Sequence, residues 1–164
     1  MSRIAEKFDQ IKQNNGKGFI PFITAGDPDL ETTYELILKL AELDSTVIEL
    51  GVPFTDPMAD GPTIQLACER ALVHHTSVAD VITMVKEFRQ SDSKTPVVLM
   101  GYLNPIEAFG YEAFAKAAVE VGIDGLLTVD LPPEESNQLA HILAKYEIDP
   151  IFLLSPTTTP ERIK

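Results

Sequence analysis

Short apolar runs alternate along the chain with longer segments in which apolar residues recur at helical spacing. The apolar runs lie at residues 18–24, 46–50, 96–100, 125–129 and 150–154. Several are apolar almost throughout, which is typical of parallel strands that are covered on both faces. Strands that alternate with helices in this way form repeated βα units, so the pattern predicts an α/β fold with about five such units.

Helix starts follow the predicted strands. In chain order they lie at Asp27-Pro28, Gly61-Pro62, Ser77, the segment around Phe114, Pro132-Pro133-Glu134-Glu135 and Thr159-Pro160. Asp27 is the predicted N-cap of the first helix, with Pro28 in its first turn. Ser77 and Asp80 predict a capping box. The two glutamates at the fifth start suit a first helical turn, because the N-terminus of a helix carries partial positive charge.

Two architectures fit this order of elements. One is a complete open sheet with helices on both faces, and the other is part of a (β/α)8 barrel. A whole barrel takes about 250 residues, more than the 164 present. The pattern alone leaves both architectures open, and in either case we expect residues 1–164 to form a single domain.

Composition narrows the class of protein. The chain carries 13 Lys and Arg against 25 Asp and Glu, a formal charge of −12, which disfavours nucleic acid and anionic membranes as partners. No apolar run reaches the roughly 20 residues that a membrane helix needs, and the charged N-terminus lacks the apolar core of a signal peptide. The single cysteine, Cys68, suits a reducing compartment. These features predict a cytoplasmic protein.

Glu49 interrupts the second predicted strand. Strand alternation places it on the face of Val47 and opposite Ile48 and Leu50. In a barrel, a carboxylate near the C-terminal end of a strand points into the mouth where active sites are built. Burial there would raise its pKa and suit it to proton transfer near neutral pH. The alternative is a structural role, in an ion pair or at a capped strand end.

The loop of residues 51–62 contains three prolines, two glycines and two aspartates, and it is the densest local signal. Asp60 precedes Gly61-Pro62, so it is a candidate partner for Glu49 in a carboxylate pair over one pocket or, alternatively, an N-cap of the next helix. Asp56 is most simply a turn former ahead of Pro57.

Two further residues follow predicted strands. Asp130 comes directly after the fourth strand, where an acid belongs either to the active face of a barrel or to a helix cap. Tyr102 lies just beyond the third strand, where it lines the same pocket or simply packs.

The remaining polar residues give weaker signals. His74, His75 and His141 lack metal-ligand spacing, and Cys68 lies on the apolar face of a helix as a small hydrophobe. The glycines near residue 16 precede a strand, unlike those of a P-loop or a dinucleotide-binding turn. We therefore expect no metal and no redox cofactor.

Four segments resemble the tryptophan synthase alpha chain family. They are residues 18–28, 48–65, 100–105 and 129–135. The longest, IELGVPFTDPMADGPTIQ, is a highly constrained and therefore specific string. The resemblance runs from about Ile4 to Lys164.

The resemblance implies a (β/α)8 barrel of which about five βα units are present here. It also implies a lyase that cleaves indole-3-glycerol phosphate to indole and glyceraldehyde 3-phosphate in tryptophan biosynthesis, without a cofactor of its own. The expected partner is a tryptophan synthase beta chain, which carries pyridoxal phosphate, in a heterotetramer of two alpha and two beta chains. The long match at residues 48–65 disfavours another phosphate-handling barrel or a flavodoxin-like sheet.

The resemblance also assigns roles to residues. Glu49 would be the acid and base that moves protons, and Asp60 would hold the indole N–H and stabilise the positive charge on the ring. The indole pocket would be lined by Phe22, Met100, Tyr102, Leu127 and Phe152 or Leu153. The surface facing the beta chain would include Pro53, Asp56, Pro57, Asn104 and Pro132.

The phosphate-binding glycines of the family follow its later strands and lie beyond this sequence. We therefore expect the 164 residues to be the N-terminal portion of a longer chain. Alone, they would have weak or no activity and would self-associate through an open sheet edge. The alternative function is a catalytically incomplete protein that only binds or modulates a beta chain.

Overall fold

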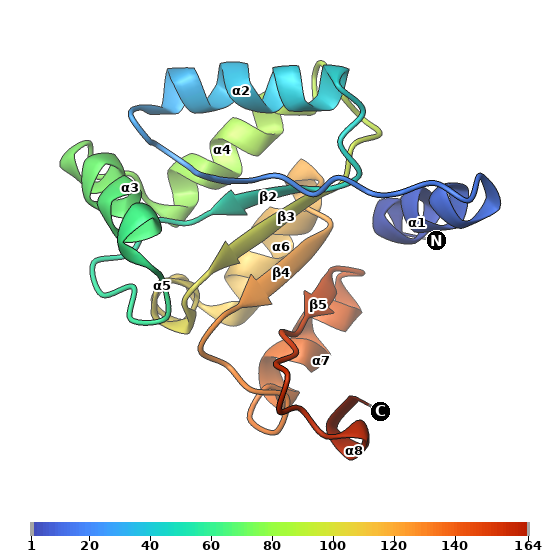
Figure 1. Ribbon diagram of the computed structural model, residues 1–164. Coiled ribbons are helices and arrows are strands. Elements are labelled where there is room, and N and C mark those ends of the chain that lie inside the picture. The colour runs from blue at the N-terminus through green and yellow to red at the C-terminus, as the bar shows by residue number, and fades with distance from the viewer. Residues whose placement is uncertain (1, 164) are drawn as a thin grey trace.

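Five parallel strands form one sheet in chain order, β1-β2-β3-β4-β5. The computed structural model describes residues 2–163 (Figure 1). The strands are β1 (Phe22–Thr24), β2 (Ile48–Gly51), β3 (Val97–Gly101), β4 (Gly125–Thr128) and β5 (Asp149–Ile151). All five predicted strands are present, although the first and last are shorter than their apolar runs.

Helices connect successive strands and flank the sheet. They are α1 (Arg3–Gln13), α2 (Leu30–Glu42), α3 (Pro62–Val73), α4 (Val78–Phe88), α5 (Leu103–Phe109), α6 (Tyr111–Val121), α7 (Asn137–Lys145) and α8 (Pro160–Ile163). Within the described residues, no helix is long and apolar enough to cross a membrane.

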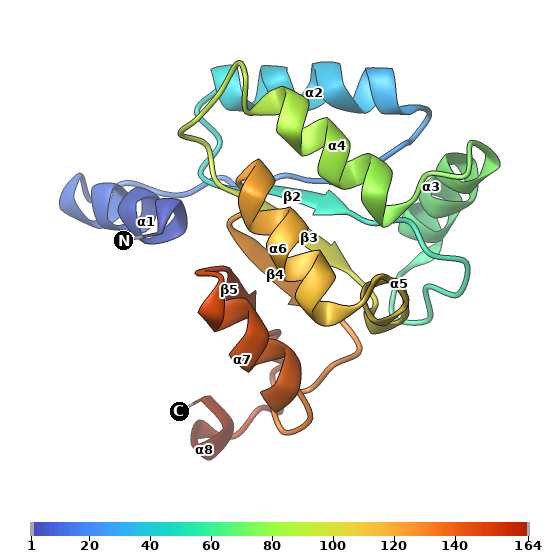
Figure 2. The same cartoon turned by 180° about the vertical axis from the view of Figure 1, so that it is seen from behind.

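The helices decide between the two predicted architectures. Figure 2 shows α2, α4, α6 and α7 side by side on one face of the sheet, and Figure 1 shows the other face free of them. A doubly wound sheet carries helices on both faces, whereas a barrel carries them only outside. The chain therefore has the fold of a (β/α)8 barrel family, with five of the strands in place.

The two faces of the sheet have different surroundings. Side chains such as Ile48, Leu50 and Leu99 point to the helices and are fully buried among them. Val47, Val98 and Leu127 form a smaller cluster on the opposite face, with Met100 and Ile151 packed against it. We call this second surface the inner face. Glu49 lies on it, as strand alternation predicted.

Four of the six predicted helix segments are confirmed, and one of them is the segment around Phe114, which lies in α6. Gly61 is the N-cap of α3 with Pro62 in its first turn, and α8 begins at Pro160. Ser77 and Asp80 form the predicted capping box of α4: the Ser77 hydroxyl accepts from the Asp80 N–H, and the Asp80 carboxylate accepts from the Ser77 N–H.

Two predicted helix starts are wrong in position. The N-cap of α2 is Asp29, whose carboxylate accepts from the Thr32 N–H at 2.7 Å. Asp27 is instead engaged by Arg70, which donates two hydrogen bonds to its carboxylate, at 2.7 and 2.8 Å. The Asp27 side chain therefore binds Arg70, a residue distant in the sequence, instead of capping the adjacent helix.

The helix predicted at Pro132 begins only at Asn137. Residues 132–136 form a turn, in which the Glu135 N–H donates to the Pro132 carbonyl. Glu134 lies in this turn and pairs with Arg162 at 2.7 Å rather than with a helix N-terminus. Leu139 and Leu143 are buried as predicted, and Ile142 packs against the same core.

Helices α1 and α5 were not predicted. Helix α1 follows a Ser2 cap and carries Ile4, Phe8 and Ile11 at helical spacing, so its signal was present in the local sequence. Helix α5 has only seven residues, includes Pro105 and has no side-chain cap of its own. Helix α5 depends on a contact with a distant part of the chain, which a local pattern does not contain.

Candidate active site

Glu49 lies between two apolar neighbours on the inner face of the sheet. The register places Phe22 of β1 and Val98 of β3 on either side of it. The carboxylate is half-buried, and burial alone raises its pKa above the ordinary value. Within residues 2–163 it has no hydrogen bond or ion pair, which contradicts the structural alternative of an ion-paired Glu49.

Phe22, Met100 and Leu127 share the inner face with Glu49. Met100 and Leu127 are register neighbours on β3 and β4, and Leu127 belongs to the small cluster of the inner face. The Phe22 ring lies over Gly51, where an added Cβ would come within 2.6 Å of it. These residues therefore make the inner face of the sheet apolar on the side where Glu49 lies.

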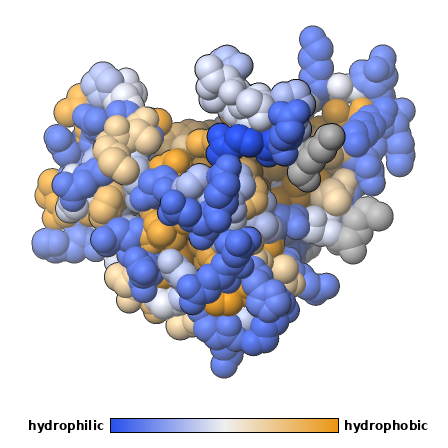
Figure 3. All heavy atoms as spheres, turned by 90° about the horizontal axis from the view of Figure 1, so that it is seen from below, coloured by the Kyte–Doolittle hydropathy of each residue, from blue (hydrophilic) through white to orange (hydrophobic). Residues whose placement is uncertain are grey.

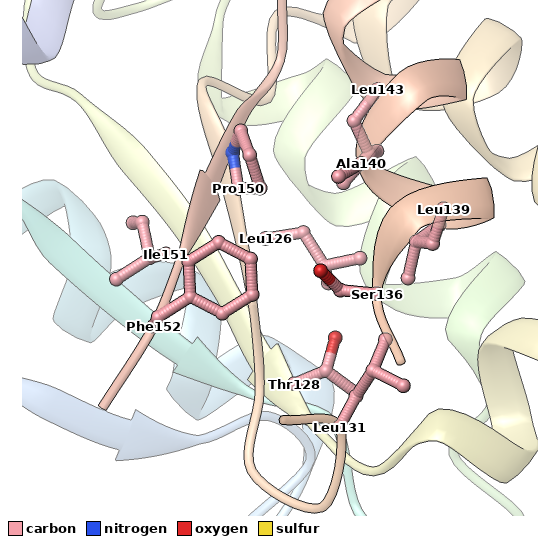
Figure 4. A pocket seen from close by; sticks show the side chains of 10 residues that line it. All are labelled: Leu126, Thr128, Leu131, Ser136, Leu139, Ala140, Leu143, Pro150, Ile151 and Phe152. Atoms are coloured by element: carbon pink, nitrogen blue, oxygen red, sulfur yellow. The ribbon is translucent and has the colours of Figure 1, made fainter. Parts of the chain in front are cut away.

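Phe152 and Leu153 are placed differently from the residues of this surface. Figure 4 shows Phe152 pointing into a pocket between β4, β5 and α7, with Leu126 and Leu139 among its lining residues, while Ile151 points away. Leu153 lies beyond the end of β5 and is 61% exposed. Because Ile151 faces inward, alternation turns Phe152 toward the helices, so its prediction as an inner-face residue is wrong.

Asp60 is held by Tyr102 rather than by the helix that follows it. The Tyr102 hydroxyl donates to Oδ2 of Asp60 at 2.9 Å and accepts from the Ala59 N–H at 2.8 Å. Helix α3 has Gly61 as its N-cap without a side-chain cap, so the alternative of Asp60 as an N-cap is wrong. Oδ1 of Asp60 has no hydrogen bond within residues 2–163. The half-buried carboxylate therefore keeps one oxygen free to accept from a ligand.

Tyr102 is buried, with 4% of its surface exposed. Burial, followed by the charge of Asp60, raises the pKa of its hydroxyl, so this group remains a proton donor at neutral pH. Its ring packs against Phe54 at a centroid distance of 5.3 Å. Tyr102 therefore packs in the core and also holds Asp60, and its place in a substrate pocket stays a prediction.

The predicted partner-facing residues differ in exposure. Asp56, Asn104 and Pro132 are exposed, Pro57 is half-buried and Pro53 is buried. Pro53 therefore presents little surface, because residues 51–53 still pack against the core as they leave β2. Asp56 shapes the turn as predicted, since its carbonyl accepts from the Met58 N–H at 2.8 Å. Figure 3 views the molecule from below and shows hydrophilic side chains over most of that surface, with apolar ones between them.

The other candidates have structural surroundings. Asp130 caps a helix, but the helix is α5, whose first residue, Leu103, donates its N–H to Oδ1 of Asp130 at 2.8 Å. Cys68 is buried in α3, as predicted. Residues 2–163 contain no group of three His, Cys, Asp or Glu side chains that could hold a metal ion.

Three residues that sequence reasoning did not select contribute to the site. Gly51 leaves room for the Phe22 ring, Phe54 packs on Tyr102, and Nε2 of Gln65 donates to the Asp60 carbonyl at 2.9 Å. A glycine inside a strand often marks a close approach, so Gly51 was detectable. Phe54 carried no local signal, because its partner Tyr102 lies elsewhere in the chain, whereas Gln65 bonds to a residue only five positions earlier and was not selected.

The arrangement supplies two carboxyl groups in different surroundings. Glu49 lies among apolar side chains, where the protonated form is favoured, and Asp60 accepts a hydrogen bond in a more exposed loop. Two acids in such different surroundings can serve as a proton donor and as a stabiliser of positive charge. No hydrogen bond joins them within the described residues, so they do not form a direct carboxyl pair.

Comparison with known proteins gives one consistent result. The alpha chains of tryptophan synthase from Marinobacter nauticus and Thioalkalivibrio sulfidiphilus are 62% and 58% identical over the whole chain, which covers 61% and 62% of those proteins. The chain thus spans about three fifths of the length of these curated relatives.

Solved structures agree with the sequence relatives. Tryptophan synthase subunit alpha from Legionella pneumophila superposes with a TM-score of 0.97 at 50% identity, over 99% of this chain and 62% of that one. A chain of the tryptophan synthase complex from Pyrococcus furiosus gives 0.84 at 42% identity, over 89% and 60%. The family model of the tryptophan synthase alpha chain matches residues 8–164. This chain therefore belongs to the tryptophan synthase alpha chain family.

Proposed function

We propose that this chain carries the acid–base residues of a carbon–carbon lyase that cleaves indole-3-glycerol phosphate to indole and glyceraldehyde 3-phosphate. Membership of the family supports the choice of reaction. The observation that carries the proposal is Glu49, a carboxyl without a partner within residues 2–163, whose pKa is raised by burial on the inner face two residues before the C-terminal end of β2 at Gly51. Active sites of barrels of this kind lie at that end of the strands.

The reaction needs a proton to move from an oxygen to a carbon. C3 of the indole ring gains a proton, the bond from C3 to the glycerol carbon breaks, and its electron pair returns to the ring. The hydroxyl on that glycerol carbon loses its proton and becomes the aldehyde. The hydroxyl loses one proton and the ring carbon gains one. A single group that first donates a proton to the carbon and then accepts one from the hydroxyl therefore completes the cycle.

Glu49 suits the transfer of that proton. A carboxyl with a raised pKa holds its proton at higher pH than an ordinary glutamate and can donate it to carbon. Its ionised form then accepts the proton of the hydroxyl. The absence of a fixed partner within residues 2–163 leaves the group free to reach both positions.

Asp60 suits the stabilisation of the ring. Protonation at C3 places positive charge on the ring nitrogen, and an ionised carboxylate stabilises that charge more in the transition state than in the neutral substrate. Tyr102 donates to one oxygen of Asp60, which leaves the other for the ring N–H. Phe22, Met100, Leu127 and Tyr102 would line the ring, whereas Leu153 would contribute only from the exposed end of β5.

The proposal includes the setting of the reaction. The chain would use no cofactor of its own and would bind a tryptophan synthase beta chain, the pyridoxal phosphate partner, in a tetramer of two alpha and two beta chains. The exposed Asp56, Asn104 and Pro132 would contribute to that interface. We also propose that residues 1–164 form part of one barrel domain and act in the cytoplasm, where a free thiol such as Cys68 is stable.

Release of indole from indole-3-glycerol phosphate tests the proposal. The purified chain is assayed alone and with a beta chain, beside Glu49→Gln and Asp60→Asn. Each substitution keeps the shape of the side chain and removes its ionisable group. We expect each to lower the rate at least about 100-fold, the scale of acid–base groups.

Two outcomes would count against this function. Near-normal turnover by either variant would overturn the role of that residue. If the unsubstituted chain releases no indole but retains a beta chain on a column, the catalytic proposal fails for this chain and the alternative of a binding or modulating protein gains support.

A further inference from the structure

Asp130 contacts a helix to which it is not adjacent in the sequence. It follows β4 by two residues, and its Oδ1 accepts from the Leu103 N–H at 2.8 Å. Leu103 is the first residue of α5, and no side chain within that segment caps the helix. The first N–H groups of a helix lack partners in the helix itself, and a carboxylate there is also favoured by the helix dipole. Asp130 therefore provides the cap that α5 lacks.

The residue before Leu103 is Tyr102, which connects this cap to Asp60. Its backbone is fixed on one side by β3, which ends at Gly101, and on the other by the capped start of α5. Its hydroxyl contacts both Asp60 and the Ala59 N–H, at 2.9 and 2.8 Å. A shift at the start of α5 would therefore move the hydroxyl that holds Asp60.

The loop that carries Asp60 has few other anchors. Thr55, Asp56, Met58 and Ala59 are all exposed. Within residues 2–163, the other hydrogen bonds of Asp60 are those of its backbone, with Gln65 of the next helix and with Pro57 in the loop itself. Exposed segments with few buried contacts open at low free energy. The position of the loop thus depends strongly on Tyr102.

We propose that Asp130 is a positioning residue for Asp60: by capping α5 it fixes Tyr102, and Tyr102 fixes the carboxylate. The hydrogen bonds described above support this positioning role without reference to an activity. The effect of Asp130 on catalysis rests on the function proposed above. Asp130 acts through other residues and does not need to touch the substrate.

Amide hydrogen exchange of the chain, followed by NMR, tests the proposal without an activity assay. The probe is the Ala59 N–H, which is protected by the Tyr102 hydroxyl. In Asp130→Ala we expect this amide to exchange about tenfold faster or more, the scale of a lost hydrogen bond to a charged group. Tyr102→Phe, which removes the hydroxyl directly, should accelerate it at least as much.

Asp130→Asn shows whether the hydrogen bond to α5 or the negative charge of Asp130 matters, and core amides show whether folding is affected. The asparagine amide oxygen accepts a hydrogen bond from the Leu103 N–H, so exchange at Ala59 should stay within about threefold of the unsubstituted chain. Amides of the core strands, such as those of Leu50 and Leu99, should be unchanged in both Asp130 variants. Glu135→Ala is the matched control: it removes an exposed acid from the same loop and should change none of these amides.

Two results would overturn the positioning role. One is unchanged exchange at Ala59 in Asp130→Ala, and the other is an equal acceleration at Ala59, Leu50 and Leu99, which would indicate general loss of stability. An indole-release assay adds the catalytic part: Asp130→Ala should lower kcat with little change in KM, and Asp130→Asn should restore it. Absence of turnover in every form would reject the proposed function, while the exchange data would still decide the role of Asp130.

Discussion

Glu49 is the residue whose surroundings are hardest to explain by stability alone. Its carboxyl is half-buried beside Phe22 and Val98, and it has no partner within residues 2–163. Burial of a charge without a partner costs free energy, and a glutamine or an apolar residue would avoid that cost. A group that lowers stability while gaining an altered pKa is typical of a catalytic position.

Glu49→Gln is expected to raise the stability of the fold near pH 7. Because the folded pKa is raised, the neutral form stabilises the fold below the unfolded pKa, and this contribution is lost as pH rises through the folded pKa. Glutamine stays neutral at every pH, so the difference between the two proteins should be larger at pH 7 than at pH 4. Urea denaturation at both pH values measures it.

Glu135→Gln serves as the comparison, since Glu135 is exposed. It should leave stability unchanged at both pH values. A variant at position 49 that is less stable at pH 7 would contradict the assignment of burial as the cause of the pKa shift.

At the scale of elements, local caps and long-range contacts position the helices by different means. Helix α4 is capped within its own sequence by Ser77 and Asp80, and its start was predicted correctly. Helix α5 is capped by Asp130 from beyond the next strand, and this helix was not predicted. The start of a helix can be read from the sequence when its cap lies within a few residues of it.

Ser77→Ala is expected to lower the free energy of unfolding by about 1 kcal/mol, the usual cost of losing an N-cap. The hydroxyl of Ser77 accepts from the Asp80 N–H, and alanine leaves that donor without its partner. Urea denaturation followed by circular dichroism gives the value.

Thr83→Ala, on the exposed side of the same helix, is the matched control. The Thr83 hydroxyl donates to the carbonyl one turn earlier, a bond that contributes little to a helix. We expect no loss of stability there, and an equal loss at both positions would argue against a specific contribution of the cap.

At the scale of the whole molecule, charged groups fix the amino ends of the strands. Asp124, with only 4% of its side chain exposed, accepts from Arg89 at 2.9 Å, from Arg3 at 2.8 Å and from the Val97 N–H at 2.8 Å. It thus joins α1, the end of α4 and the start of β3. Catalytic groups lie at the opposite ends of the strands, so this network supports the fold away from the site.

Arg89→Ala should destabilise the chain by about 3 kcal/mol, because it leaves the buried Asp124 without its main partner. Arg3→Ala should cost less than about 1 kcal/mol, since the Arg3 side chain is 36% exposed. Urea denaturation of both variants tests the difference. Equal losses would show that exposure does not set the strength of these two pairs.

Hydrophobic pattern alone determined the five strands and the face on which Glu49 lies, whereas the order of the strands in the sheet came from the structure. Period-two alternation needs no tertiary contact to place Glu49 opposite Ile48 and Leu50. The residues of the 48–65 segment further indicated the family, which the family model confirms. Their roles as catalytic and partner-facing residues remain predictions.

Tertiary structure alone decided which contacts each polar side chain makes. Asp27, Asp60 and Asp130 each had a plausible cap nearby, yet they bind Arg70, Tyr102 and the Leu103 N–H. The sheet gives a second example. Its apolar strands were compatible with helices on both faces, and only the tertiary structure shows the helices on one face. A pattern along the chain records local preferences, whereas partners brought together by folding compete for the same group, and the better geometry prevails.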